Sequence, residues 1–187
     1  MRKPMLAAML TVLSLTSVLA AAPGASAEET RCVGTIGPRL LDNVRVPAGK
    51  TCVLNGTRLK GTLKVERNAT LRATKIRVNG NVQAENHKLV SLSGSIVGGQ
   101  VQIDQGGAFQ VGANRVTGGI QVVANAGASK LNQNVVNQDV QVFDHDGGVA
   151  VNGNRIDGNL QCKENTPPPT GGGNVVQGNK EDQCEDL

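Results

Sequence analysis

Aromatic side chains are nearly absent from this sequence. Its 187 residues include no tryptophan, no tyrosine and only two phenylalanines, Phe109 and Phe143. A conventional β-sandwich or helical bundle relies on larger side chains to fill its core. Proteins that bind nucleic acid by base stacking also depend on aromatic side chains, so we expect no nucleic-acid partner. The composition favours a narrow core that small β-branched residues can fill.

Long apolar runs are absent after residue 27, but one precedes it. Residues 5–22 are almost wholly apolar or small, a basic pair stands at Arg2 and Lys3, and residues 25–27 read Ala-Ser-Ala. This pattern is typical of a secretory signal peptide, so we predict that residues 1–27 are cleaved after Ala27 and that the protein is secreted to the extracellular space. An uncleaved membrane anchor is the alternative. After cleavage, no segment remains that could span a membrane.

Recognisable catalytic motifs are also missing. The sequence has no Ser-His-Asp arrangement, no pair of histidines at metal-ligand spacing and no phosphate-binding loop. One cluster, Asp144-His145-Asp146, could hold a divalent cation such as Ca²⁺ or perform acid–base work. The simpler interpretation of this cluster is a polar turn. We therefore expect no catalytic residue and no cofactor, with a calcium site at Asp144 and Asp146 as the alternative, and we expect His87 to be exposed.

Charge is unevenly distributed along the chain. Residues 28–99 contain 12 Lys and Arg against 5 Asp and Glu, whereas residues 100–187 contain 5 against 10. The basic half could bind a polyanion such as an acidic polysaccharide or teichoic acid. The simpler interpretation is a solvated outer face whose charges keep strand edges soluble. The cations in question are Arg45, Arg58, Lys60, Lys64, Arg67, Arg72, Lys75 and Arg77.

Apolar residues recur every 19 or 20 positions from residue 44 onward. The first column consists of Val44, Leu63, Val82, Val101, Ile120, Val140 and Leu160. The second consists of Cys52, Leu71, Val90, Phe109, Ser129 and Val149, and the third of Leu59, Val78, Val97, Val116, Val136, Ile156 and Val176. In the first two columns a further mostly apolar position follows two residues later, which is the period of a β-strand. Three short strands per repeat, separated by Gly- and Asn-rich corners, predict a parallel β-helix.

We therefore predict an all-β, single-domain parallel β-helix solenoid. Residues 43–179 should form about seven coils of 19–20 residues. Residues 28–42 are expected to form an irregular N-terminal cap and residues 180–187 a C-terminal tail. Residues 165–173, with three prolines and three glycines, are expected to form a loop. The coil length and unequal faces favour a right-handed helix over the alternative, a left-handed hexapeptide helix.

The four cysteines lie near the two ends of the predicted stack. Cys32 and Cys52 are 20 residues apart, and Cys162 and Cys184 are 22 apart, about one coil in each case. Four cysteines allow three pairings, but only the pairing Cys32–Cys52 with Cys162–Cys184 closes each end locally. Secretion makes oxidation of these thiols expected.

Two amide-bearing residue types also recur at coil spacing. Glutamine occupies the position between the paired residues of the first face in five successive coils: Gln83, Gln102, Gln121, Gln141 and Gln161. Asparagine recurs at a corner as Asn114, Asn134, Asn154 and Asn174. Both rows are expected to form hydrogen bonds along the stack. If either binds a ligand, the outward-facing glutamines are the better candidates, as a platform for a glycan.

The repeat resembles that of a known group of proteins. Residues 151–159, Val-Asn-Gly-Asn-Arg-Ile-Asp-Gly-Asn, residues 160–162, Leu-Gln-Cys, and residues 172–180, Gly-Gly-Asn-Val-Val-Gln-Gly-Asn-Lys, resemble small secreted actinobacterial proteins of unknown function. More broadly, the chain is similar to right-handed β-helix proteins of the pectate-lyase-like superfamily, and its rhythm is similar to that of bactofilins. The calcium-binding acids and catalytic base of a lyase cannot be assigned here. Bactofilins are cytoplasmic and lack disulfide caps.

Three functions follow as hypotheses. The preferred one is a non-enzymatic extracellular module with a structural or surface-binding role, whose partner is a polysaccharide or another cell-envelope component. The first alternative is a polysaccharide-active lyase or hydrolase that uses Asp144, His145 and Asp146. The second alternative is self-assembly, in which monomers join end to end through the basic and acidic halves.

Overall fold

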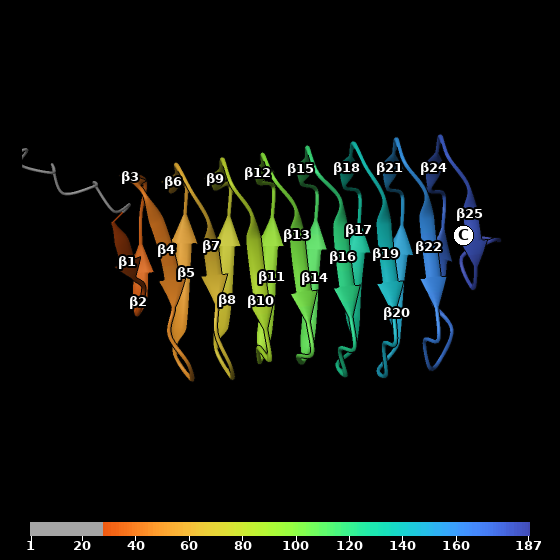
Figure 1. The fold of residues 1–187 in the computed structure, drawn as a ribbon, viewed down its shortest axis with the longest axis horizontal. Helices are drawn as coiled ribbons and strands as arrows, with labels where there is room; N and C mark the ends of the chain where they lie inside the picture. The colour runs from red at the N-terminus through yellow and green to blue at the C-terminus, as the bar shows by residue number, and fades with distance from the viewer. Residues whose placement is uncertain (1–27) are drawn as a thin grey trace, which may run out of the picture.

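The structure, a computed structural model, describes residues 28–187, which wind into a parallel β-helix (Figure 1). The predicted signal peptide lies outside the described residues. Each full coil contributes one strand to each of three sheets, and the strands of successive coils pair in parallel. No helix occurs within residues 28–187, so no helix there is long and apolar enough to cross a membrane.

The three sheets are named here by their strands. Sheet A consists of β1 (Glu29–Arg31), β4 (Asn43–Val46), β7 (Leu63–Val65), β10 (Val82–Glu85), β13 (Val101–Asp104), β16 (Ile120–Val123), β19 (Val140–Phe143), β22 (Leu160–Lys163) and β25 (Lys180–Asp182). Sheet B consists of β2 (Gly34–Ile36), β5 (Thr51–Asn55), β8 (Thr70–Thr74), β11 (Leu89–Ser93), β14 (Ala108–Gly112), β17 (Ser129–Asn132), β20 (Val149–Asn152) and β23 (Thr170–Gly172). Sheet C consists of β3 (Leu40–Leu41), β6 (Arg58–Leu59), β9 (Arg77–Val78), β12 (Ile96–Val97), β15 (Arg115–Val116), β18 (Val135–Val136), β21 (Arg155–Ile156) and β24 (Val175–Val176).

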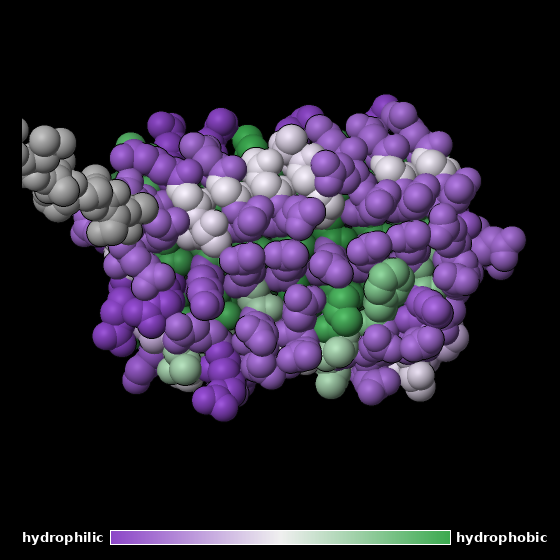
Figure 2. All heavy atoms as spheres, in the orientation of Figure 1, coloured by the Kyte–Doolittle hydropathy of each residue, from purple (hydrophilic) through white to green (hydrophobic). Residues whose placement is uncertain are grey.

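The core is the bore of the helix, and the predicted apolar columns fill it. Val82 of β10, for example, pairs in register with Leu63 on one side and Val101 on the other, and all three side chains are buried. Because side chains alternate along a strand, the residues between the apolar ones point outward. On the face seen in Figure 2, hydrophilic side chains form rows along the stack, with hydrophobic surface visible between the rows. The all-β parallel β-helix predicted from the sequence is confirmed, and its right-handedness stays a prediction.

The asparagine row is buried at the corner between sheets B and C. The side-chain Oδ1 of Asn134 accepts the backbone N–H of Asn114 at 3.1 Å, and its Nδ2 donates to the Val111 carbonyl at 2.9 Å. Asn154 and Asn174 repeat this pattern in the following coils. The left-handed backbone conformation belongs to the residue before each asparagine, not to the asparagine itself. These preceding residues are Ala113, Gln133, Gly153 and Gly173.

A second buried row, which the repeat pattern did not predict, lies at the corner between sheets A and B. The Oδ1 of Asn125 accepts the N–H of Gly106 at 2.9 Å, and the Oδ1 of Asn165 accepts the N–H of His145 at 3.1 Å. His87 occupies the same corner at an earlier coil. The prediction that His87 is exposed is wrong, because this corner turns its ring into the bore and leaves only 3% of the residue exposed.

Both predicted disulfides are present near the ends of the stack. Cys32 pairs with Cys52 and Cys162 with Cys184, with Cα atoms 5.5 and 5.2 Å apart. No free cysteine occurs within residues 28–187. Two disulfides of this kind are typical of proteins that fold in an oxidising, extracellular environment.

The paired region extends further than the sequence indicated. Residues 28–42, expected to be irregular, contain β1, β2 and β3, and the tail contains β25. Sheets B and C have eight strands each, which gives eight coils where about seven were predicted. The expectation that residues 165–173 form only a loop is also wrong, because β23 pairs with β20 through Thr170, Gly171 and Gly172. A Cβ at Gly171 would collide with the Val151 carbonyl, so glycine is required for this pairing.

Candidate ligand-binding face

The outer face of sheet A carries the predicted glutamine row, and we refer to it as the glutamine face. Register pairing places Gln83 beside Gln102, Gln102 beside Gln121, and so on to Gln161. Neighbouring strands of a sheet lie about 4.8 Å apart, so the five amides recur at that interval. The row continues into Arg45 and Lys64 at the N-terminal end and Glu181 at the C-terminal end. The result is an uncharged central stretch flanked by cations on one side and an anion on the other.

Hydrogen bonds between coils hold part of this row in place. Nε2 of Gln83 donates to Oε1 of Gln102 at 3.1 Å, and Nε2 of Gln141 donates to Oε1 of Gln161 at 2.8 Å. Within the described chain, the Gln121 side chain makes no hydrogen bond to either neighbour, and it lines a small hollow with Gln138, Asp139 and Gln141. The middle of the row therefore has amide groups available to a ligand.

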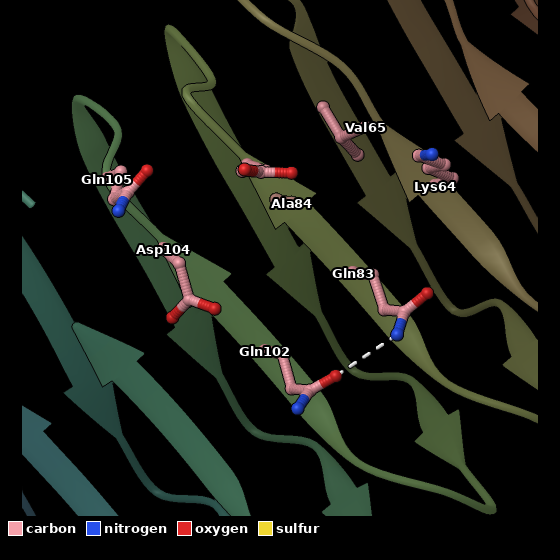
Figure 3. A pocket seen from close by; sticks show the side chains of 8 residues that line it. Lys64, Val65, Gln83, Ala84, Gln102, Asp104 and Gln105 are labelled. Carbon is pink, nitrogen blue, oxygen red and sulfur yellow. Dashed lines mark hydrogen bonds between the residues drawn. The ribbon is translucent and has the colours of Figure 1, made fainter.

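A shallow groove of about 310 Å³ lies over the first half of the row (Figure 3). Gln83 and Gln102 form one side of this groove, and Lys64, Asp104 and Gln105 also line it. Figure 3 shows the Gln83–Gln102 hydrogen bond running from β10 to β13, with the Asp104 side chain further along β13. The groove thus combines amides, a cation and two carboxylates, because Glu85 lines it as well.

Two carboxylates meet in this groove. Glu85 and Asp104 are register partners on β10 and β13. Burial raises the pKa of the Asp104 carboxyl, and the nearby Glu85 carboxylate raises it further, although the Val123 backbone N–H partly opposes these effects. Oδ1 of Asp104 is buried and has no hydrogen-bond partner in the part of the chain that the structure describes. Protonation of Asp104 is therefore easier than that of an ordinary surface carboxylate.

The same outer column changes from acidic to apolar along the stack. Asp104 pairs with Val123 of β16, Val123 with Phe143 of β19, and Phe143 with Lys163 of β22. Val123 and Phe143 are half-buried and lie two residues after Gln121 and Gln141 on the same strands. One aromatic side chain therefore stands on the glutamine face. Strand alternation from Val140 could have revealed this position, since Gln141 and Phe143 must share a face.

The Asp144-His145-Asp146 cluster does not converge on one site. The His145 residue is fully buried, its Nε2 lies 3.2 Å from the Gly148 carbonyl oxygen, and its ring packs on Phe109. Asp144 and Asp146 are exposed on either side of it. Within residues 28–187, no group of three His, Cys, Asp or Glu side chains could hold a metal ion. The cluster therefore consists of two exposed carboxylates on either side of an imidazole that belongs to the core.

No family model, curated protein or solved structure matches this chain.

Proposed function

We propose that the protein is a secreted, non-enzymatic β-helix that binds a polysaccharide along the glutamine face. The observation that carries this proposal is the row of five in-register glutamines with Val123 and Phe143 beside it. An amide both donates and accepts hydrogen bonds, as a sugar hydroxyl does. The Phe143 ring offers an apolar surface for a sugar ring, as the aromatic side chains of binding sites commonly do.

The rigidity of the stack favours this role. Each of the five strands that carry the glutamines has a paired neighbour on both sides, and the disulfides Cys32–Cys52 and Cys162–Cys184 fix the ends of the stack. A ligand therefore meets side chains that are already ordered, and binding costs little conformational entropy. A polymer whose hydroxyl groups recur along its length can contact several coils at once. Several weak contacts made together then give a higher overall affinity than any one of them.

The test is a binding assay with the mature, oxidised protein and a panel of cell-wall and plant polysaccharides. The double variant Gln121→Ala/Gln141→Ala and the single variant Phe143→Ala should each weaken retention on the bound glycan. Gln110→Ala is the matched control, because Gln110 is an exposed glutamine of β14 on sheet B. Retention that is unchanged in the glutamine-face variants, or equally reduced in the control, would reject this face as the site.

A second candidate function rests on the carboxylate pair in the groove. A glycoside hydrolase uses two carboxyl groups, one of which has a raised pKa and acts as the general acid. Asp104, with its raised pKa and its partner Glu85, has this character. The panel above should therefore also be assayed for release of reducing or unsaturated ends, with calcium and with chelator. Product release that is lost in Asp104→Asn and Glu85→Gln would establish the enzyme and overturn the preferred function.

Secretion and family membership belong to the same proposal. The disulfides support an extracellular location, and the apolar run of residues 5–22 supports export. Kinship with secreted actinobacterial β-helix proteins of the pectate-lyase-like superfamily stays a prediction supported by the repeat pattern. N-terminal sequencing of the exported protein tests the cleavage after Ala27.

A further inference from the structure

Sheet C presents a line of arginines on the outside of the stack. Each of its strands is two residues long, and its second residue points into the bore or packs against the core. The first residue points outward in every coil. These outward residues are, in order along the stack, Leu40, Arg58, Arg77, Ile96, Arg115, Val135, Arg155 and Val175.

The four arginines of this line are exposed and unpaired. In the described part of the chain, no carboxylate lies within 4.0 Å of any of their guanidinium groups. Two other cations are neutralised by carboxylates of neighbouring coils. Arg45 contacts Glu29 at 2.7 Å and Glu66 at 3.1 Å, and Lys60 contacts Asp42 at 2.9 Å.

Two of the arginines also face each other directly. Arg58 and Arg77 are register partners on adjacent strands. Like charges directly opposite each other destabilise a sheet. The nearest acidic residue along the chain, Asp157, is two residues from Arg155, but its carboxylate accepts a hydrogen bond from Gln177 at 3.0 Å. The line therefore keeps its positive charge at some cost to the fold, which is the expected pattern for a surface that binds an anion.

Apolar side chains separate the later arginines. Ile96 stands between Arg77 and Arg115, and Val135 stands between Arg115 and Arg155. Ile96 is 37% exposed and Val135 is half-buried, so both offer apolar surface to a ligand. Adjacent strands are about 4.8 Å apart, so these three arginines recur about every 10 Å along a straight line.

We propose that this arginine line binds a linear acidic polysaccharide that carries carboxylates, a polyuronate. The planar guanidinium pairs with a carboxylate through two parallel hydrogen bonds. The apolar side chains between the arginines match the ring faces of the sugars, which a simple polyphosphate lacks. This surface lies on a different sheet from the glutamine face and shares no residue with it, so variants of one surface test one proposal without affecting the other.

The experiment measures binding of the oxidised protein to polygalacturonate at low salt, with polyphosphate as the comparison polyanion. The triple variant Arg77→Gln/Arg115→Gln/Arg155→Gln should bind polygalacturonate at least about tenfold more weakly, because three charge-assisted contacts are lost. The matched control is Arg67→Gln/Arg72→Gln/Lys130→Gln, which removes the same charge from exposed positions off this line. The control should retain most of the affinity, and added NaCl should weaken wild-type binding. Circular dichroism at the assay temperature verifies that each variant is folded.

The apolar positions give a second measurement. Ile96→Ser/Val135→Ser should weaken binding to polygalacturonate while leaving binding to polyphosphate unchanged. Three results would overturn the proposal: no wild-type binding to polygalacturonate at low salt, an equal loss in the control triple variant, or a preference for polyphosphate over polygalacturonate. Loss of binding in Gln121→Ala/Gln141→Ala but not in the arginine variant would also overturn it, since the polymer would then sit on the glutamine face.

Discussion

The rings of Phe109 and His145 meet edge to face inside the bore, with centroids 5.5 Å apart and planes at 65°, although the residues come from coils two levels apart. Ser129 belongs to the coil between them, and its hydroxyl accepts the backbone N–H of Phe109 at 3.0 Å. This contact places an ionisable imidazole in an apolar environment. Burial lowers the pKa of His145, with smaller opposing effects from the Gly148 and Gly127 backbone and from Asp146.

The buried histidines should make the fold sensitive to acid. The unfolded chain binds protons at histidine near pH 6.5, whereas burial lowers the pKa of both His87 and His145 in the folded chain. The contribution of the two neutral histidines to stability is therefore fully present above about pH 6.5, and it is lost as the pH falls below that value. Between pH 7.5 and 5.5 we expect a loss of about 1 kcal/mol per histidine. Urea unfolding at both pH values measures this loss.

The control for this prediction is His145→Asn, which places an amide in a row that already contains Asn125 and Asn165. The variant should lose less stability than the wild type over the same pH interval. If His145→Asn and the double variant His87→Asn/His145→Asn both kept the pH dependence of the wild type, the buried histidines would not be the source of the acid sensitivity.

Asp104 should have the opposite effect on the pH dependence of stability, because protonation of its carboxyl favours the folded chain. Because its pKa is raised in the folded chain, the protonated form is favoured by folding, and this contribution disappears as the pH rises through the folded pKa. Asp104→Asn should therefore stabilise the protein at pH 7 by about 1 kcal/mol. The difference from wild type should shrink towards pH 4. Thermal unfolding at both pH values checks this, and a variant less stable than wild type at pH 7 would count against it.

The asparagine row should be a major determinant of stability. Asn134→Ala removes the acceptor for two donors of Asn114 and the donor to the Val111 carbonyl, all of them buried. Buried groups left without partners cost about 1–3 kcal/mol each, so a loss of roughly 3 kcal/mol or more is expected. Asn132→Ala is the control, because Asn132 lies on the outside of β17 and its side chain makes only one hydrogen bond in the described chain, at 3.3 Å from Asn152. Equal losses for the two variants in urea unfolding would refute this role.

A glycine at the left-handed corner position should stabilise the fold. Ala113 has φ of 55°, whereas the equivalent residues Gly94 and Gly153 have φ of 59° and 61°. Left-handed backbone strains an L-residue with a Cβ but not glycine. Ala113→Gly should therefore raise the free energy of unfolding by about 0.5–1 kcal/mol. Ala150→Gly, in strand β20, should lower it by a similar amount, and a loss of stability in Ala113→Gly would contradict this account of the corner.

The sequence predicted the middle of the stack well because its coils repeat at a constant spacing. Columns such as Val82, Val101 and Ile120 differ by 19 residues and pair in the predicted register. The first coil could not be predicted in this way, because its spacing to the next coil differs. Glu29 pairs with Asn43, only 14 residues later, so its residues fall outside columns spaced by 19 or 20.

Composition is a poor guide to structure at positions where backbone geometry decides it. The triple glycine of residues 171–173 predicts a loop, but Gly171 keeps the 20-residue register and pairs with Val151 without a side chain. The polarity of His87 and His145 suggests exposure, but their corner position turns both side chains inward. Composition marks Phe143 only as a rare aromatic residue, whereas strand alternation places it on the same outer face as Gln141.

The most direct test of the proposed function is a nuclear magnetic resonance titration with the glycan that the panel identifies. The side-chain amide signals of Gln121 and Gln141 and the ring signals of Phe143 should shift on addition of the glycan, while the side-chain amide of Gln110 on sheet B should not. Shifts confined to sheet B or sheet C, or the absence of shifts with every glycan in the panel, would contradict the assignment of the glutamine face as a polysaccharide-binding surface.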